Sequence, residues 1–411
     1  MSIGKAAPVL IVGAGIAGLT LARLLQNAGI ANIVFEQSGR ERAQGFSISL
    51  RDWGFEALLN ALDDASLTAL QRCVAPDRNL GGSGELDQLM RDNSTGNVII
   101  TPDASQLQTV VRANRNALRD WISDCGEDEL DIRYNHKLKT IQGTLGNVVA
   151  TFQNGSKHRG SVLIAADGVN SQCRALTLPQ VVPQTLPALV YHGELSMTHD
   201  EFRHSLGPWM ANSNILAGVG DGFNTPITVC NTTRSHVHLD WSYSRAPRKG
   251  EDLPGVPTPT TDGCKQAPQA LLEELGSLNL AAPWRDILSP SSVQTHSVVH
   301  WASRSVWIDR KDLASAKANG VVFVGDAWHA MPIFGGEGGN HAMLDAVQLA
   351  ENMSKHKDAD SAIEAYYSRA STRCEDAVRR SRQRFHILHR PISEWYELAE
   401  KRKLAMSGKK V

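Results

Sequence analysis

The segment from Pro8 to Gln37 constrains the fold more than any other part of this 411-residue chain. It reads PVLIVGAGIAGLTLARLLQNAGIANIVFEQ. Val9 to Val12 form a continuous apolar run, which is typical of a strand buried on both faces. Leucines then recur at helical spacing until Gly29, and a second apolar run begins at Asn32. The segment therefore predicts a strand–helix–strand unit, the building block of a parallel sheet.

The turn of this unit carries the glycine pattern of a dinucleotide-binding loop. Gly13 permits the tight turn, Gly15 lets the main chain approach a pyrophosphate, and Gly18 lets the helix pack closely on the strand. Phosphate charge then lies at the helix N-terminus. Glu36, which ends the second strand, is placed to bind a ribose hydroxyl, and we assign Ala17 of the loop to the cofactor site as well. This loop alone does not separate FAD from NAD.

A second glycine-rich turn lies far along the chain, after the apolar run VVFV. It reads GDAWHAMP and leads into GGEGGN, the start of another predicted helix. An aspartate here can bind a ribitol hydroxyl, and the glycines admit the edge of a flavin to the helix amides. The residues that we assign to this part of the cofactor site are Asp326, Gly336, Gly338, Gly339 and Asn340. The alternative is a capped surface loop, but two anion-facing helix termini favour a long dinucleotide, FAD.

The patterning of the whole chain predicts an α/β protein with a Rossmann-like FAD-binding domain, a β-rich substrate domain and C-terminal helices. Short alternating runs rich in aromatic and histidine side chains mark the β-rich part, and an amphipathic helix is predicted over 106–124. The predicted FAD-binding domain comprises residues 1–70, 106–180 and 301–355. The other predicted parts are substrate-domain strands at 71–105, the substrate domain at 181–300 with a loop at 247–269, and a helical segment at 356–411.

Composition excludes several classes of function. The chain has 42 Lys and Arg against 43 Asp and Glu, a balance that does not suggest a nucleic-acid partner. The six cysteines form no CxxC pair, which argues against a disulfide framework or a zinc site, so we expect no metal. No stretch approaches the ~20 apolar residues of a membrane span, and the first residues lack the apolar core of a targeting peptide. We therefore expect a cytoplasmic protein without a transmembrane segment, and the oligomeric state stays open.

Three motifs, in this order along the chain, resemble the group A flavoprotein monooxygenases, the family of para-hydroxybenzoate and salicylate hydroxylases. The first is the GxGxxG loop with Glu36. The second is the segment from Ala166 to Arg174, which begins ADGVNS, and the third is the turn from Gly325 to Asn340. The resemblance implies a para-hydroxybenzoate hydroxylase-like fold. It spans nearly the whole chain.

The resemblance also implies roles for three further residues. Arg115, in RNALRDWI, matches a helix arginine that contacts FAD, and Asp167 matches a residue associated with both FAD and NAD(P)H. Arg51 matches an arginine that lies near flavin or NADPH in relatives. A strand-ending turn remains the alternative for Asp167, and a solvated loop charge remains the alternative for Arg51.

The second glycine turn departs from the family pattern, which reads close to AAHxxPPxGGxGxN after the GD pair. Trp328 replaces a small residue, Ile333 replaces the second proline and Glu337 replaces the usual glutamine. The version GEGGNHAMLDA looks more like fungal secondary-metabolism members than bacterial phenol hydroxylases.

The family's chemistry belongs to the cofactor. NADPH or NADH reduces the flavin, O2 adds at C4a, and the hydroperoxide donates one oxygen to an electron-rich substrate. The resemblance thus implies a monooxygenase that hydroxylates or epoxidises an aromatic or polycyclic small molecule. No catalytic acid or base is identified. A flavin reductase or dehydrogenase on the same fold, or a non-catalytic binding protein, remain the alternatives.

Candidate substrate contacts come mainly from the β-rich part. They are Tyr191, His238 and Trp241, together with Trp328 of the second glycine turn. In HVHLDW, strand alternation would put His238 and Asp240 on one face. The aromatic residues are equally compatible with a hydrophobic core.

Overall fold

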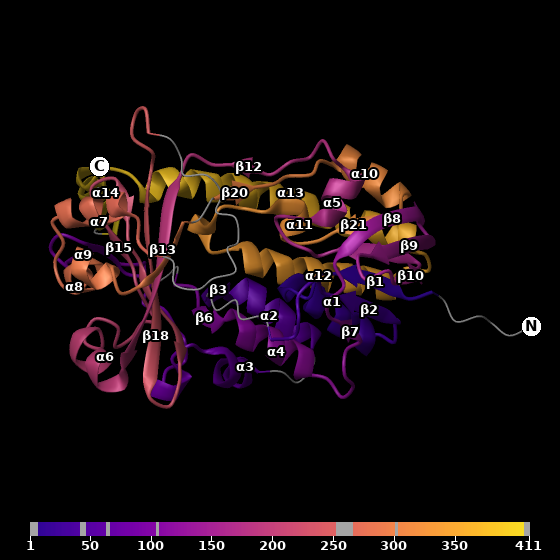
Figure 1. Cartoon of the computed structure of the whole chain (residues 1–411), viewed down its shortest axis with the longest axis horizontal. Helices are drawn as coiled ribbons and strands as arrows, with labels where there is room; N and C mark the ends of the chain where they lie inside the picture. Colours follow the sequence, from indigo (N-terminus) through magenta and orange to yellow (C-terminus); the bar gives the residue numbers. More distant parts are fainter. Residues whose placement is uncertain are drawn as a thin grey trace, which may run out of the picture.

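The computed structural model describes residues 7–41, 47–62, 66–103, 107–251, 266–300 and 303–406. Part of the loop expected at 247–269 and the start of the helix expected at 106–124 lie outside the described residues. In Figure 1 a parallel sheet with its helices lies on the right and a tall antiparallel sheet lies on the left, with the long C-terminal helices running along both.

A parallel sheet of five described strands forms the first half of the molecule. Its order is β21-β11-β1-β2-β7, and β1 pairs in register with β11 on one side and β2 on the other. The strands are β1 Val9–Val12, β2 Asn32–Phe35, β7 Ile132–Arg133, β11 Val162–Ala165 and β21 Val321–Phe323. Because the strands are parallel, the segments that follow β1, β2, β11 and β21 meet at one edge. All three predicted motifs lie at that edge.

Helices cover the parallel sheet and reach across to the second half. α1 and α12 pack on each other, and α12 also contacts α2 and α13. The helices of this half are α1 Ile16–Asn27, α2 Asp52–Ala61, α3 Leu67–Val74, α4 Arg115–Asp124, α5 Gln172–Thr177, α10 Arg310–Ala318, α11 Asp326–His329, α12 Gly338–Lys355 and α13 Ala359–Leu388. The apolar strands β1, β11 and β21, buried on both faces, form the centre of the main hydrophobic core with these helices.

Small strand pairs and short 3₁₀ turns complete this half. β8, β9 and β10 form an antiparallel meander, β3 pairs with β6, and β12 pairs with β20. Their bounds are β3 Ser47–Arg51, β6 Val110–Asn114, β8 Leu138–Thr144, β9 Asn147–Phe152, β10 Lys157–Gly160, β12 Gln184–Thr185 and β20 Arg304–Ser305, with 3₁₀ turns η1 Arg78–Leu80 and η3 Ile333–Gly335.

A nine-stranded sheet forms the second half, and two long antiparallel strands dominate it. β13 Leu189–Thr198 pairs with β18 His236–Arg245 over their full length. The other described strands are β4 Met90–Asp92, β5 Val98–Ile100, β14 Ile215–Leu216, β15 Gly218–Val219, β16 Phe223–Asn224, β17 Ile227–Thr232 and β19 Ser297–His300. β4 and β5, from the segment assigned to substrate-domain strands, join this sheet through β15.

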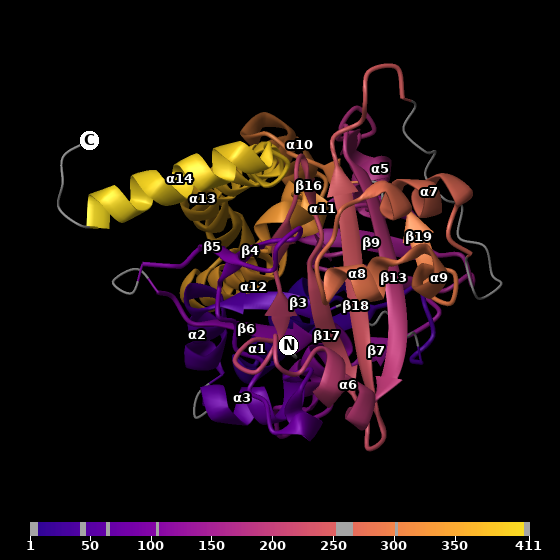
Figure 2. The ribbon, with the colours of Figure 1, turned by 90° about the vertical axis from the view of Figure 1, so that its left-hand side faces the viewer.

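The two faces of this large sheet differ in chemistry. Leu239, Trp241 and Tyr243 point to a second hydrophobic core, whose other side is formed by short helices. These helices are α7 Gln269–Ser277, α8 Trp284–Leu288 and α9 Pro290–Val293, while α6 His199–Ser205 follows β13. Figures 1 and 2 show α7, α8 and α9 on the side of the sheet that faces away from β3 and β6. The opposite face therefore looks toward the parallel-sheet half.

The prediction of a helix over 106–124 is wrong for residues 110–114. Val110–Asn114 form strand β6, and the helix α4 begins only at Arg115. The apolar residues Val111 and Ala113 alternate into the core as a strand requires, and β6 pairs with β3 along five residues. The side chain of Asn114 then accepts from the amide of Ala117 at 3.0 Å and so caps the helix.

Two helices end the described chain. α13 runs over thirty residues, close to the predicted helical tail, and α14 Ile392–Met406 packs Trp395 on β5 and β15. None of the described helices is both long and apolar enough to cross a membrane.

Replacing Trp241 tests the second core. The indole of Trp241 is fully buried, and its Nε1 donates to Nδ1 of His296 at 3.0 Å. We expect Trp241→Phe to lower the free energy of unfolding by about 1–3 kcal/mol, because it leaves a small void and a buried ring nitrogen without its donor. Chemical denaturation measures this loss. Trp209→Phe, at the partly exposed margin of the same core, should cost less; equal costs would contradict the assignment.

Candidate functional site

The GxGxxG loop leaves one of its three glycines facing open space. A side chain on Gly13, whose φ is 110°, would collide with the main chain of Ala166, and one on Gly18 would collide with the carbonyl of Gly13. These two glycines therefore allow β1, α1 and the segment after β11 to approach each other. A Cβ on Gly15 would meet no atom within 4 Å. The space above Gly15, at the N-terminus of α1, is where the pattern predicts a pyrophosphate.

Glu36 fixes the loop from the neighbouring strand. Its Oε2 accepts from the amide of Ala14 at 3.0 Å, and its Oε1 accepts from the amide of Ser38 at 2.9 Å. Each carboxylate oxygen can accept a second hydrogen bond. Glu36 thus orients the turn while keeping the capacity to accept from a ribose hydroxyl, the role predicted for it.

Two arginines one helical turn apart extend this site from α4. Arg115 is the first residue of α4, and Arg119 donates from Nε to the carbonyl of Ala14 at 2.8 Å. The sequence motif pointed to Arg115 and not to Arg119. The spacing of four residues in RNALR was the available signal, because such residues share a helix face.

Asp326 lies at the opposite side of the same edge, at the start of α11. It follows Gly325, whose φ of 58° lets the chain turn sharply after β21. The Asp326 side chain is exposed, yet the protein around it is dense enough for desolvation to raise the pKa of its carboxyl, while His329 and Arg115 oppose that shift. Asp326 therefore faces an open space inside the fold together with Arg115.

The ADG segment connects the two glycine turns. Asp167 Oδ2 accepts from the amide of Cys173 at 3.0 Å, while its buried Oδ1 has no hydrogen-bond partner among the described residues. Arg174 is buried, and its guanidinium donates to the carbonyls of Ala327 at 2.9 Å and Val169 at 2.5 Å. Arg174 thus joins this segment to the second glycine turn, and the free oxygen of Asp167 is available to a ligand.

Asn340 binds strand β3, whereas the sequence assigned it to the cofactor site. Its Nδ2 donates to the carbonyl of Ser49 at 2.8 Å, and its Oδ1 accepts from the amide of Arg51 at 2.7 Å. Both ends of the amide are thus bonded to β3. A side chain on Gly54 would collide with Asn340, so α2 also packs tightly here. Asn340 positions the turn of Gly336, Gly338 and Gly339 against β3. Gly338 and Gly339 begin α12, whereas the amide of Gly336 already donates to the carbonyl of Ile333 at 3.0 Å.

Three arginines converge on Glu337, the residue that departs from the family pattern. The Glu337 carboxylate lies 3.7 Å from Nε of Arg51, 3.3 Å from Nη2 of Arg384 and 4.0 Å from Nη2 of Arg380. Arg51 and Arg384 also donate to the carbonyl of Gly335 at 3.3 Å. One carboxylate among three guanidinium groups leaves this corner beside the glycine turn positively charged.

A buried ionic cluster binds the main chain of the second glycine turn through Asp345. Oδ2 of Asp345 accepts from the amide of Gly325 at 2.8 Å and from Nε2 of His329 at 2.6 Å, and Nη2 of Arg373 lies 2.6 Å from Oδ1. Burial by itself would raise the pKa of Asp345, but the charges of His329 and Arg373 hold that pKa well below its usual range. The ligand atoms of His329, Asp345 and Cys374 lie within 4.8 Å of one another. Because Arg373 already neutralises the carboxylate, this cluster is an ion-pair network rather than a metal site.

Three of the predicted substrate residues lie in hydrophobic cores. Tyr191 and Trp241 point to the face of the large sheet that α7 and α8 cover, since Tyr191 lies opposite Tyr243 in the pairing register. Trp328 is fully buried, donates to the carbonyl of Ile308 at 3.0 Å, and packs on aromatic rings of α13. Sequence patterns could not separate these cores from a ligand-facing surface, because both are rich in aromatic residues.

His238 lies on the other face of the sheet. This polar sheet face consists of His192, Glu194, His238, Asp240 and Ser242, which alternate with the core residues along β13 and β18. It looks toward the β3–β6 strand pair: the side chains of Ser47 and Asn114 both donate to the carbonyl of Cys230 in β17. His238 and Asp240 share this face, as the alternation in the sequence predicted.

An aromatic wall adjoins the polar sheet face near the second glycine turn. The ring centroid of Phe334 in η3 lies 5.1 Å from that of Phe385 in α13. The ring centroid of Phe385 lies 4.4 Å from that of His389. Val190 of β13 packs against Phe385, and Oγ of Ser244 lies 2.8 Å from Nε2 of His389. The polar sheet face, the β3–β6 strand pair and this wall meet at the second glycine turn.

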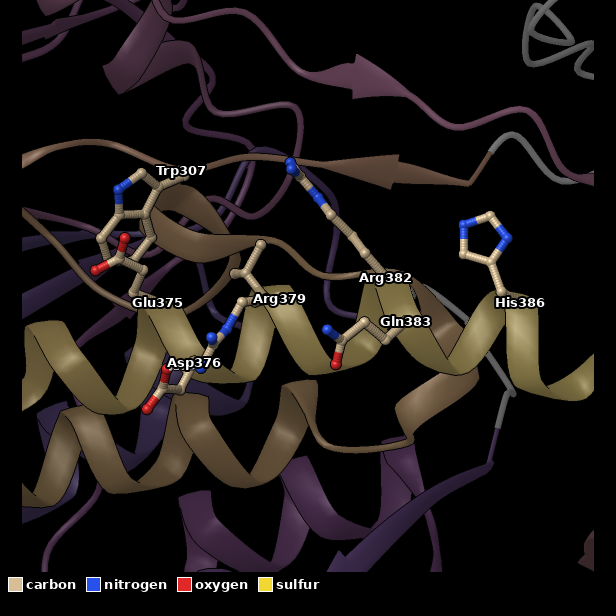
Figure 3. A pocket seen from close by; sticks show the side chains of 8 residues that line it. Trp307, Glu375, Asp376, Arg379, Arg382, Gln383 and His386 are labelled. Atoms are coloured by element: carbon tan, nitrogen blue, oxygen red, sulfur yellow. Dashed lines mark hydrogen bonds and ion pairs between the residues drawn. The ribbon is translucent and has the colours of Figure 1, made fainter.

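A separate groove lies along α13, between that helix and the segment of Trp307 (Figure 3). It has a volume of about 550 Å³. Its arginines are already engaged: Arg379 pairs with Asp376, and Arg382 donates to Oγ of Ser305 at 3.0 Å. Its lining shares no residue with the three motifs, so we do not place the cofactor there.

Comparison with known sequences places the chain in one family. The family described as "FAD binding domain" matches residues 6–249 and 282–381. The FAD-dependent monooxygenase vrtH of Penicillium aethiopicum is 57% identical over 96% of this chain and 96% of its own length. The FAD-dependent monooxygenases adaC of Aspergillus niger and nscC of Trichophyton tonsurans are 56% and 55% identical, over 98% and 96% of this chain and 98% of each relative.

Solved structures of low sequence identity share the fold. HpxO of Klebsiella pneumoniae, crystallised with FAD and uric acid, has a TM-score of 0.73 at 19% identity and covers 97% of this chain and 93% of its own. The 2,6-dihydroxypyridine-3-hydroxylase of Arthrobacter nicotinovorans has a TM-score of 0.72 at 18% identity, over 94% of this chain and 93% of its own. The fold class expected from the sequence is confirmed.

A side chain at Gly15 should abolish FAD retention. Because a Cβ there meets no protein atom, Gly15→Val should fold normally but occupy the space that the pyrophosphate needs. We expect purified Gly15→Val to carry little FAD, measured as flavin absorbance per protein, with an apoprotein melting temperature equal to that of the wild-type apoprotein. Gly15→Ala should lose less flavin. A full complement of FAD in the valine variant would overturn the placement.

Removing the Asp345 charge should destabilise the protein. Asp345→Asn leaves Arg373 and His329 buried without their counter-ion, which should cost about 3–5 kcal/mol of unfolding free energy. The exposed pair of Asp376 and Arg379 provides the control, since Asp376→Asn should cost less than about 1 kcal/mol. Because the folded-state pKa of Asp345 is lowered, its contribution is complete above the usual carboxyl pKa and is lost as the pH falls toward the lowered value. Denaturation curves at several pH values measure both effects.

Proposed function

The chain belongs to the family of FAD-dependent monooxygenases, and on that premise we propose that it uses NADPH or NADH and O2 to hydroxylate or epoxidise an aromatic or polycyclic small molecule. The single observation that carries the proposal is the convergence of the three motifs at one edge of the parallel sheet, beside the polar sheet face. That arrangement offers one space for a dinucleotide and a neighbouring one for a planar molecule.

The residues present fit FAD. Gly15 leaves room at a helix N-terminus, Glu36 and Asp326 offer carboxylate oxygens, and Asp167 keeps a buried oxygen unbonded. When bound, FAD supplies the redox chemistry: it takes up reducing equivalents from NAD(P)H and activates O2. The protein binds and orients the two reactants and keeps water away from them.

The proposed substrate space lies between the polar sheet face, the β3–β6 strand pair and the aromatic wall of Phe334, Phe385 and His389. Aromatic rings on one side suit a planar ring system, because they contribute stacking and apolar contact. Burial lowers the pKa of His389 to about 4, so its ring is neutral at physiological pH. A neutral aromatic wall beside polar groups fits an aromatic substrate that carries oxygen substituents.

The positively charged corner around Glu337 fits the phosphates of NAD(P)H. Arg51, Arg380 and Arg384 together exceed the charge of the one carboxylate between them, and Arg51 was assigned to flavin or NADPH from the sequence. The corner lies beside Gly335 of the second glycine turn, within reach of the proposed flavin space. We place the reductant's phosphates here, without a choice between NADH and NADPH.

The relatives named above come from fungi, in keeping with the resemblance of GEGGNHAMLDA to fungal sequences. A role in secondary metabolism and a cytoplasmic location complete the proposal. Five of the six cysteines lie in the described residues, and all five are free thiols there, which accords with a reducing compartment.

Oxygen consumption tests the proposed reaction. We expect the purified holoenzyme to oxidise NADPH or NADH slowly by itself and much faster with one member of a panel of hydroxylated naphthalenes and anthraquinones, with O2 taken up and one oxygen atom from ¹⁸O2 found in the product. The same assay under nitrogen is the control, because a reductase or dehydrogenase would turn over equally well without O2. Protein that never binds FAD would instead support a non-catalytic role.

A further inference from the structure

The groove along α13 lies apart from the proposed cofactor space. It runs between the helix and the segment of Trp307, has a volume of about 550 Å³, and is lined on its helical side by residues between Glu375 and His386 (Figure 3). Another side of the same helix packs on the second glycine turn, where Oγ of Ser381 donates to the carbonyl of Pro332 at 2.6 Å. Helix α13 therefore stands between the groove and that turn.

One end of the groove carries an arginine that is held in place without an acidic partner. Arg382 donates from Nε and Nη2 to Oγ of Ser305, at 3.1 and 3.0 Å, and from Nη2 to Oε1 of Gln184 at 3.2 Å. Both acceptors are neutral, and the guanidinium makes no ion pair with any residue that the structure describes. The exposed His386, one helical turn further along, adds a second donor. An oriented guanidinium with a neighbouring imidazole suits a carboxylate.

The other end of the groove carries a carboxylate of its own. Glu375 is exposed, and Figure 3 shows it beside the indole of Trp307. Within the described part of the chain it has no hydrogen bond or ion pair. Asp376 and Arg379, the other charged residues of the lining, pair with each other. The groove thus has a cationic end at Arg382 and an acceptor end at Glu375.

The part of the groove between these ends is apolar. The ring of Trp307 is partly exposed and stacks on the fully buried Trp328, with centroids 5.8 Å apart and an angle of 26° between the planes. Val378 lies on the helix between Glu375 and Arg382. Because Trp328 fixes the indole, a planar ring that stacks on it orders little further protein. The helical rise separates Glu375 from Arg382 by roughly 10 Å along the axis, a span that suits one or two fused rings.

We propose that the groove along α13 is a second ligand site, which binds a planar aromatic acid with a hydroxyl at the end opposite its carboxylate. The carboxylate lies at Arg382 and His386, the ring lies against Trp307 and Val378, and the hydroxyl donates to Glu375. Charge sets this orientation, because Glu375 repels the carboxylate that Arg382 attracts. The site goes beyond the monooxygenase reaction, since no bond is made or broken there and the cofactor takes no part.

Equilibrium binding to the oxidised holoenzyme, without NAD(P)H, measures this site separately from turnover. The probe is 6-hydroxy-2-naphthoate, compared by isothermal titration calorimetry with its methyl ester, which has no charge, and with 2-naphthoate, which has no hydroxyl. We expect the wild type to bind the probe about fivefold or more tightly than the ester, because a hydrogen bond to a charged group is stronger than a neutral one. 2-Naphthoate should bind about threefold more weakly than the probe, through the loss of one hydrogen bond.

Two substitutions separate the ends of the groove. Arg382→Met should remove the preference for the probe over its ester and leave the affinity for the ester unchanged, while Arg382→Lys should keep part of the preference. Glu375→Met should make the probe bind no better than 2-naphthoate without weakening 2-naphthoate, which has no hydroxyl to donate. As the matched control, Arg203→Met makes the first change on the exposed surface of α6 and should alter none of the three affinities.

Binding at another place, or a purely structural role of Arg382, gives different results. A probe that occupies only the proposed substrate space will bind Arg382→Met and Glu375→Met as it binds the wild type, and the proposal is then wrong. If Arg382 only holds Ser305 and Gln184 in place, Arg382→Met will weaken the probe and its ester by the same factor, which also overturns it. Equal affinity of the wild type for the probe and the ester would do the same.

The exposed position of Glu375 decides the question if Arg382→Met lowers the melting temperature or the FAD content of the protein. Undiminished discrimination between the probe and 2-naphthoate in Glu375→Met would then reject the site. The proposed function is tested independently, because binding in the groove needs neither reductant nor O2. Failure of O2 consumption with intact probe binding would reject the proposed reaction but not this site.

Discussion

The close approach of three main-chain segments at the carboxyl edge of the parallel sheet is the constraint on which the rest of the structure depends. A side chain on Gly13 would collide with Ala166, and one on Gly18 would collide with Gly13. Only because both positions lack a Cβ can α1 start directly over β1 and beside the segment after β11. That contact places the N-terminus of α1 and the open space at Gly15 at the same edge of the sheet as Asp326, which we propose to be the other end of the cofactor space.

Buried charges also hold this edge of the sheet in place, because they bind the main chain of the second glycine turn. Arg174 binds the carbonyl of Ala327, and Asp345 binds the amide of Gly325, so both fix the second glycine turn through its main chain. Asp345 itself is balanced by His329 and Arg373. Such a network contributes a defined geometry more than net stability, because desolvation offsets much of the attraction between its charges. The turn that presents Asp326 is therefore fixed before any ligand arrives.

The large sheet uses one face for the hydrophobic core, and its other face is the one proposed for substrate recognition. Alternation along β13 and β18 sends one set of side chains, including Trp241, into the core under α7 and α8, and the other set, including Asp240, toward the β3–β6 strand pair. A shift of one residue in register would exchange the two faces. The extensive aromatic core on one face keeps that register, and so keeps Asp240 on the polar sheet face.

The sequence by itself determined the cofactor half of the site. Glycine spacing, strand patterning and the order of the motifs act locally, so Gly15, Glu36 and Asp326 could be placed at the sheet edge from residue order alone. Only the tertiary structure decided which face of its strand or helix each predicted site residue occupies, and which residues it contacts. Tyr191, Trp241 and Trp328 proved to be core, and Asn340 proved to bind β3. Those outcomes depend on tertiary contacts, such as that of Asn340 with Ser49, 291 positions away, which no local spacing encodes.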